Sequence, residues 1–116
     1  MDKRESTGNA LVDKSFEFAK AIVNFHRILQ DDKQFEIASQ LIRSGTSIGA
    51  NSREAQRAES KRDFKHKLKI ALKEADESMY WLELINETIV EVPSELYELN
   101  EELVKLLVKI IVNTKD

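Results

Sequence analysis

A chain of 116 residues with a formal net charge of −3 has room for one domain and hardly for two. It contains no cysteine, which excludes disulfides, a thiolate metal site and a cysteine nucleophile, and which suits a reducing cytoplasm. Three glycines and one proline are fewer turn residues than an all-β or α/β chain needs. We expect no signal peptide, and no apolar run approaches the ~18 residues of a membrane span.

The first expected helix covers residues 10–30, after a flexible N-terminus at residues 1–9. Apolar side chains recur there at three- and four-residue spacing, which is typical of an amphipathic helix. They are Leu11, Phe18, Ile22, Phe25 and Leu29, with Val12, Phe16, Ala19, Val23 and His26 beside them. Residues 31–32 then form a short turn, which favours an antiparallel neighbour.

The second expected helix covers residues 34–57 and contains an unusual run of small and polar residues at 44–52. Propensity alone predicts a loop for this run, since each glycine costs up to ~1 kcal/mol in a helix interior. The apolar period nevertheless continues through it, so we expect a helix with a small-residue seam that lets another helix approach closely. The predicted inner side contains Phe35, Ala38, Leu41, Ile42, Gly45, Ile48 and Ala55.

Two further helices are expected at residues 61–88 and 94–113. Ser60 can cap the first of them by accepting the backbone N–H of Asp63, and Pro93 breaks the chain between the two. The apolar period of the third helix runs through Phe64, Leu68, Ala71, Ala75, Met79, Leu82, Ile85 and Ile89. The fourth has two apolar stripes, one with Leu96, Leu99, Leu103, Leu106 and Ile110, the other with Val104, Leu107, Val108 and Ile111.

Short connections between long helices predict an all-α fold, an antiparallel up-down-up-down four-helix bundle at residues 10–116. Several helices are apolar over more of their circumference than one bundle core needs. This surplus indicates burial against a second subunit, so the first expected partner is the chain itself.

The sequence gives little support for an enzyme or a metal site. Bundle di-metal sites use Glu-x-x-His pairs, but Val23 precedes His26 and Asp63 precedes His66 at that spacing. No glycine-rich phosphate loop and no nucleophilic triad can be assembled. We therefore expect no catalytic residues, no metal, no cofactor and no small-molecule substrate. Glu74 and Glu77 lie on one helix face, where a salt-bridged polar layer is the simpler interpretation.

Charge is unevenly distributed along the chain. Residues 43–73 hold nine Lys or Arg against three Asp or Glu, whereas residues 74–116 hold three against eleven. Such a basic tract could neutralise phosphates of a nucleic acid, or it could be a solvated face, or it could meet the acidic C-terminal half of another subunit. The candidate nucleic-acid-binding residues are Arg53, Arg57, Lys61, Arg62, Lys65, Lys69 and Lys73.

A polar stripe also follows the second helix through its small-residue run. Arg43, Ser47, Asn51 and Glu54 are spaced by four, four and three residues. Buried polar groups need partners, so we expect this ladder to face Glu74, Glu77 and Tyr80 of the third helix and to fix helix register or an interface.

Two blocks of residues resemble a known family. They are residues 39–41, 43, 47–48, 50–51 and 54–55, and then residues 63–64, 70–75, 77 and 80–84. The chain resembles the four-helix-bundle proteins encoded in intervening sequences of bacterial 23S ribosomal RNA genes, a family related to the accessory variability determinant of diversity-generating retroelements. Much of that family has proline at the position of Gly49 and glycine at that of Ala55.

The resemblance implies an up-down-up-down bundle that assembles as a homopentamer and has no catalytic activity. For the retroelement relatives it implies binding to a reverse transcriptase and to nucleic acid through a basic surface. The expected function is therefore that of an oligomeric interaction or scaffold protein, with an RNA-binding or reverse-transcriptase-accessory factor as the alternative.

Overall fold

The computed structural model describes residues 6–115, which form four α-helices joined by short connections. The helices are α1 (Ala10–Asp31), α2 (Phe35–Ala55), α3 (Lys61–Thr88) and α4 (Ser94–Asn113). Asn9 caps α1 by accepting the N–H of Val12, and Ser60 caps α3 by accepting the N–H of Asp63. The bounds of α3 and α4 agree with those predicted, and α2 is shorter than predicted at both ends.

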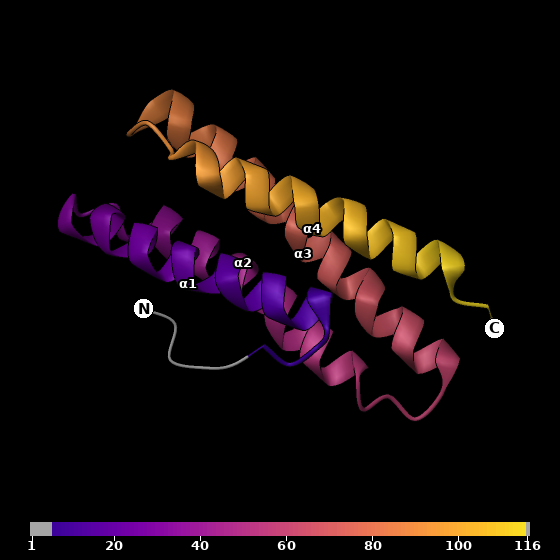
Figure 1. Cartoon of the computed structure of the whole chain (residues 1–116). Helices are drawn as coiled ribbons and strands as arrows, with labels where there is room; N and C mark the ends of the chain where they lie inside the picture. The colour runs from indigo at the N-terminus through magenta and orange to yellow at the C-terminus, as the bar shows by residue number, and fades with distance from the viewer. Residues whose placement is uncertain (1–5, 116) are drawn as a thin grey trace.

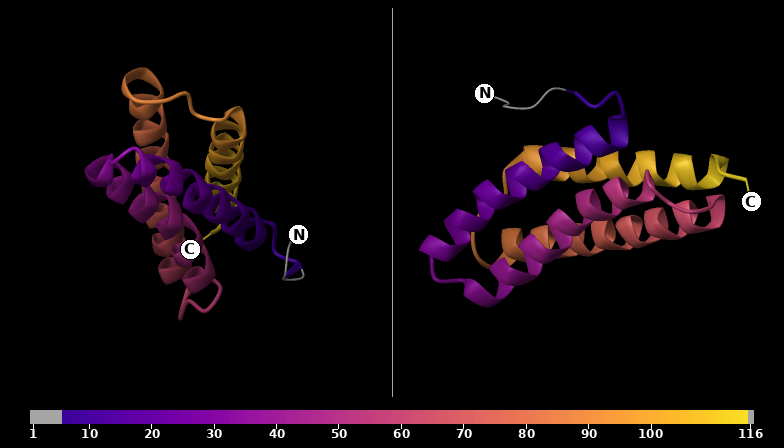
Figure 2. Two further views of the ribbon diagram at one scale, coloured as in Figure 1. Left: turned by 90° about the vertical axis from the view of Figure 1, so that its left-hand side faces the viewer. Right: turned by 90° about the horizontal axis from the view of Figure 1, so that it is seen from below.

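Each helix packs against two neighbours in a closed square, α1 on α2, α2 on α3, α3 on α4 and α4 on α1. Consecutive helices run in opposite directions along an elongated body of 45 × 29 × 21 Å (Figures 1 and 2). The prediction of an antiparallel four-helix bundle is confirmed. Among the described residues, no helix is long and apolar enough to cross a membrane.

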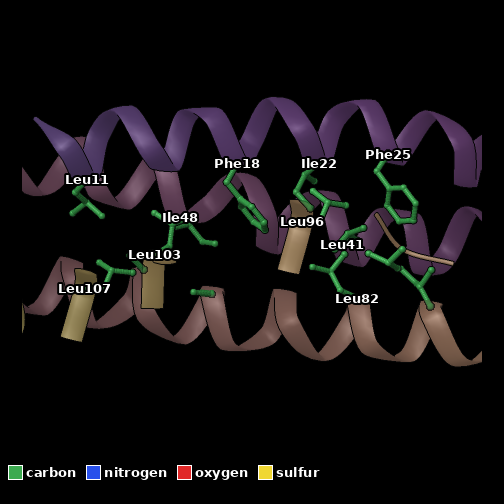
Figure 3. Packing of buried hydrophobic residues seen from close by; sticks show 14 of the residues in the cluster. Leu11, Phe18, Ile22, Phe25, Leu41, Ile48, Leu82, Leu96, Leu103 and Leu107 are labelled. Carbon is green, nitrogen blue, oxygen red and sulfur yellow. The ribbon is translucent and has the colours of Figure 1, made fainter. Parts of the chain in front are cut away.

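Apolar side chains from all four helices fill the centre of the bundle (Figure 3). Phe18 and Ile22 of α1, Leu41 of α2 and Leu82 of α3 are completely buried. Two expectations were wrong in detail. Phe35 lies at the first residue of α2 and is 60% exposed instead of facing inwards. On α3 it is Ser78, and not its neighbour Met79, that is fully buried.

The small-residue run of α2 is helical, as expected, and α1 packs closely on it. A Cβ atom added to Gly45 would lie 2.9 Å from both γ carbons of Ile22, so only glycine leaves room for that side chain. A Cβ on Gly49 would lie 3.4 Å from the Ser15 carbonyl oxygen, an ordinary contact. The buried residues of this seam are Ser44, Gly45, Ile48 and Ser52.

The described part of the N-terminal segment, residues 6–9, is hydrogen-bonded to the start of α1. The hydroxyl groups of Ser6 and Thr7 donate to the Asp13 carboxylate at 2.7 and 2.9 Å. Residues 1–5 of the predicted flexible N-terminus lie outside the described residues, and flexibility stays a prediction. In the turn after α1, Lys33 has a φ of 59°, which is uncommon for a residue with a side chain.

Candidate interaction surfaces

The basic residues singled out from the sequence lie at the end of α2 and along the first half of α3, where most are exposed to solvent. We call this set the basic surface: Arg53, Arg57, Lys61, Arg62, Lys65, Lys69 and Lys73. Lys65 is half-buried, and its Nζ donates to the Thr114 carbonyl oxygen at the end of α4 over 3.4 Å. The neighbouring Lys67 is held by Glu54 at 3.2 Å.

The polar ladder reaches α3 through Arg43. Its guanidinium lies 3.2 Å from the carboxylate of Glu74 and also pairs with that of Glu77. The indole N–H of Trp81 donates to Glu77 over 3.3 Å. Glu74 is 9% exposed, so Arg43 supplies the charge that a nearly buried carboxylate requires. The structure thus joins three members of the ladder across the α2–α3 boundary.

The other members of the ladder make different contacts. Ser47 donates to the carbonyl oxygen of Arg43 over 2.6 Å, and Asn51 donates to that of Ser47 over 2.9 Å. Both bonds stay within α2. Glu54 pairs with Lys67, and Tyr80 is 59% exposed with its ring edge-on to Trp81 at 5.2 Å between centroids.

Two groups of apolar side chains remain at the surface of the completed bundle. The first, here the α2–α3 apolar patch, consists of Phe35, Ile37, Trp81 and Ile89, with polar residues of α2 and Thr88 around them. The second, here the α1 apolar patch, consists of Phe16, Ala19 and Val23. A groove between α1 and α2, lined by Gly49 and Ala50, adjoins the second patch.

A third surface feature is a groove between α3 and α4. Its apolar lining comes from Met79, Tyr97 and Val104, and its charged lining from Asp76, Glu83, Glu101 and Lys105. Tyr97 donates from its hydroxyl to the Leu82 carbonyl oxygen over 3.2 Å. Partial burial, and then the negative charges of Glu83 and Glu87, raise the pKa of Tyr97 above its ordinary value.

Asn100 also lines this α3–α4 groove, and it is fully buried. Neither its amide nitrogen nor its amide oxygen has a hydrogen-bond partner among residues 6–115. Sequence reasoning missed Asn100 because it is polar, although it stands in the inward stripe of α4 at four residues from Leu96 and three from Leu103. A polar residue in phase with an apolar stripe was the available signal.

Ser78 was missed in the same way. It lies three residues after Ala75 and four before Leu82, in phase with the buried face of α3. Its hydroxyl oxygen is 3.0 Å from that of Ser44 and 2.9 Å from the Glu74 carbonyl oxygen. The two serines therefore join α2 to α3 beside the Arg43 cluster.

The two histidines differ in their exposure to solvent. His26 is half-buried on α1 and His66 is exposed on α3. Within the part of the chain that the structure describes, no three His, Asp or Glu side chains are grouped so that they could hold a metal ion.

Fold and surface together define an antiparallel four-helix-bundle protein whose distinctive features are patches and grooves on its outside. The family model of the 23S rRNA-intervening sequence proteins matches residues 8–112. The chain belongs to that family, which confirms the resemblance to the proteins of 23S ribosomal RNA intervening sequences.

A solved structure agrees with this assignment. It is a crystal structure of a protein with unknown function from the S23 ribosomal protein family of Bacteroides thetaiotaomicron VPI-5482. The two chains are 48% identical, with a TM-score of 0.81, over 88% of this chain and 98% of the other. No curated protein matches the chain.

Proposed function

We propose that the protein is a non-enzymatic interaction or scaffold protein of the cytoplasm that works as a homo-oligomer, with the homopentamer implied by the family resemblance as its assembly. The observation that carries the proposal is the α2–α3 apolar patch. A single chain already closes its own core, yet Phe35 is 60% exposed, and Ile37, Trp81 and Ile89, which pack against that core, are only partly buried.

Exposed apolar side chains that lie together, with polar residues around them, mark interaction sites. Phe35 is the clearest case, since its side chain is 60% exposed and lies next to other apolar side chains. Trp81 and Ile37 lie beside it, and aromatic side chains are enriched at interface centres. The α1 apolar patch offers a second, different surface, so one copy could present each patch to a different neighbour.

The test is the mass of the protein in solution at micromolar concentration, by light scattering and sedimentation equilibrium. We expect five times the 13.4 kDa mass of the chain. Phe35→Glu should lower the mass, because burying the carboxylate would leave it without a partner. Val112→Glu is the matched control, since Val112 is 71% exposed and lies outside both patches. A wild-type protein that stays at 13.4 kDa contradicts the proposal.

The alternative function, an RNA-binding or reverse-transcriptase-accessory factor, is favoured by the basic surface. Lys61, Arg62, Lys69 and Lys73 are all exposed on one half of α3. If they bind phosphates, affinity for structured RNA should fall steeply as salt rises. Lys69→Glu with Lys73→Glu should abolish binding.

The control for that experiment carries the same change of charge away from the basic surface. Arg27→Glu with Lys33→Glu alters two exposed cations near the opposite end of the bundle, where α1 ends. Equal loss of affinity in both variants would indicate a general charge effect. Undetectable binding by the wild type at ~50 mM salt would rule this alternative out.

A further inference from the structure

The α2–α3 apolar patch and the surface between α1 and α2 differ in shape. The patch presents a large aromatic side chain, since Phe35 is 60% exposed at the start of α2. The other surface is a groove of about 370 Å³, here called the α1–α2 groove. Its apolar lining includes Phe16, Ala19, Gly49 and Ala50. Three of these four residues are small, so the groove has room for a bulky apolar side chain of another molecule.

Packing within one chain does not explain the glycine in this groove. At Gly45 the close approach of Ile22 excludes any side chain, but a Cβ on Gly49 would lie at an ordinary 3.4 Å from the Ser15 carbonyl oxygen. Alanine would therefore fit at position 49, and it favours a helix interior more than glycine does. Glycine lowers the stability of the helix there and keeps the groove open. A molecule that enters the groove accounts for this choice of residue.

Each surface also has an exposed charge without a partner among residues 6–115. On the side of the patch that Trp81 lines, Glu36 is the only charged residue among the described lining residues. In the groove the corresponding cation is Arg53. Glu54, which also lines the groove, already pairs with Lys67 at 3.2 Å. The patch thus offers an unpaired anion and the groove an unpaired cation.

Glu36 and Arg53 cannot pair within one chain. They lie in the first and the last turn of α2, about 25 Å apart along a straight helix with a rise of 1.5 Å per residue. An ion pair between them requires two copies. Complementary charges at the edge of an interface guide two surfaces into one register.

We propose that the α2–α3 apolar patch of one copy packs into the α1–α2 groove of a second copy, with Phe35 in the groove and Glu36 beside Arg53. The contact rests on the proposed oligomer and names the two surfaces that form it. Because the two surfaces differ, the interface is heterologous, and it closes into a ring when the rotation between neighbours permits. Every copy in such a ring presents its patch to one neighbour and its groove to the other.

The chain has no cysteine, so a pair of introduced cysteines can report the contact directly. With Glu36→Cys and Arg53→Cys in one chain, a short bis-maleimide should join copies into a ladder of covalent dimers, trimers and higher forms. Within one copy the separation of about 25 Å exceeds the reach of the reagent. Either cysteine alone should leave the chain monomeric in a denaturing gel. Glu98→Cys with Lys109→Cys, two exposed positions on α4, is the matched control and should give no ladder.

The length of the ladder decides between the possible contacts. A ladder that continues beyond the dimer supports the proposed head-to-tail contact. A ladder that stops at the dimer would indicate a two-fold contact, and no product from an oligomeric chain would show that the two positions do not meet. Either of these results overturns the contact and leaves the oligomer standing. A wild type that stays monomeric contradicts this contact and the proposed function together.

Charge reversal measures what the ion pair contributes. Glu36→Arg and Arg53→Glu should each weaken self-association about 10-fold in sedimentation equilibrium, whereas Glu98→Arg and Lys109→Glu on α4 should not. The chain with both substitutions at positions 36 and 53 keeps the net charge of −3 and should regain most of the lost association. Unfolding of the dissociated chain should be unaffected, because both side chains are exposed there. A double variant that associates no better than the single variants overturns the pairing and the contact.

Ala19→Glu tests the groove side of the contact. A carboxylate in the groove would meet Phe35 and Glu36 of the second copy, so the mass in solution should fall as it does for Phe35→Glu. Ala10→Glu, at the exposed first residue of α1, should leave the mass unchanged. Helix content by circular dichroism shows that each variant is folded. If Phe35→Glu dissociates the oligomer and a folded Ala19→Glu does not, the patch packs against another surface and the proposal is overturned.

Discussion

The seam of α2 and the inner face of α4 both contain buried polar side chains, but the two regions differ in how many of these side chains are hydrogen-bonded. In the seam, Ser44 lies against Ser78, and glycine at position 45 brings α1 close. The Ser52 hydroxyl is the exception there, being buried without a partner among the described residues. On α4, the larger amide of Asn100 is buried with both polar atoms unpaired. Apart from Ser52, the buried side chains of the seam are therefore satisfied within one chain, whereas the amide of Asn100 on α4 is not.

We expect the largest loss of stability from a substitution that adds side-chain volume to the seam of α2. Gly45→Val would place a branched side chain where even a Cβ meets Ile22 at 2.9 Å, and Ile22 is itself branched and fully buried. We expect a loss of about 3 kcal/mol in the free energy of unfolding, measured by chemical denaturation. Ala50→Val, on the exposed side of α2, should cost less than ~1 kcal/mol. Adding Ile22→Ala to Gly45→Val should recover part of the loss, and no recovery would place the strain elsewhere.

The next effect tests the polar boundary between α2 and α3. Arg43→Met leaves Glu74 nearly buried beside Glu77 without its cation. We expect a loss of about 2 kcal/mol by denaturation, since an unpaired buried acceptor loses more than the pair itself contributed.

Two variants control that prediction. Arg53→Met changes an exposed arginine of the same helix and should cost less than ~0.5 kcal/mol. Glu74→Gln in the Arg43→Met chain should restore part of the stability, because it removes the unpaired charge. If Arg43→Met costs no more than Arg53→Met, the cluster is a surface ion pair of little consequence.

Replacing the buried polar residue of α4 should raise stability, in contrast to the two substitutions above. Asn100→Leu removes the unpaired amide, and we expect a gain of about 1 kcal/mol in the unfolding free energy of the dissociated chain. The measurement is denaturation at low protein concentration, where association contributes least. A loss of stability would mean that Asn100 is already satisfied within one chain, which would erase the contrast with the seam.

Much of this architecture could be predicted from the sequence, because apolar periodicity and helix ends are local signals. The Ser60 cap and the break at Pro93 located α3 and α4 correctly. The period also outweighed the loop propensity of residues 44–52, since tertiary packing of α1 on Gly45 stabilises the helix there.

The errors have physical causes. Phe35 is in phase with the core, but it stands at the end of the bundle, where α2 begins and no helix covers it. Ser78 and Asn100 are buried because their positions face inwards, and hydrophobicity alone could not select them over Met79 and Leu99. The pairing of Glu54 with Lys67 depends on the rotation of α2 against α3, which periodicity does not determine.

Alanine substitution should have small and opposite effects on stability at the two glycines of α2. Gly49→Ala adds a Cβ at an ordinary 3.4 Å from the Ser15 carbonyl oxygen, and alanine favours a helix interior by up to ~1 kcal/mol. We expect a gain of about 0.5 kcal/mol. Gly45→Ala, with its Cβ 2.9 Å from Ile22, should lose stability instead. Equal effects at both positions would show that α1 does not approach one end of the seam more closely.

Tyr97 lies beside the α3–α4 groove, and there we expect an effect on the pKa of the phenol more than on stability. Its pKa lies above the ordinary 10.0 because of burial and then of Glu83 and Glu87. The native chain thus holds this proton more tightly than the unfolded chain. The corresponding stabilisation is complete below pH 10 and is lost as pH rises through the folded-state pKa.

The measurement is the phenolate absorbance of the wild type minus that of Tyr97→Phe, which isolates Tyr97 from the second tyrosine of the chain. Its midpoint should lie above 10.0, and Glu83→Gln should lower it, whereas Glu17→Gln on α1 should leave it in place. A midpoint at or below 10.0 would show that neither burial nor the two carboxylates raise the pKa of Tyr97. It would also weaken the view of this groove as an acidic region of the bundle, because Glu83 belongs to its charged lining.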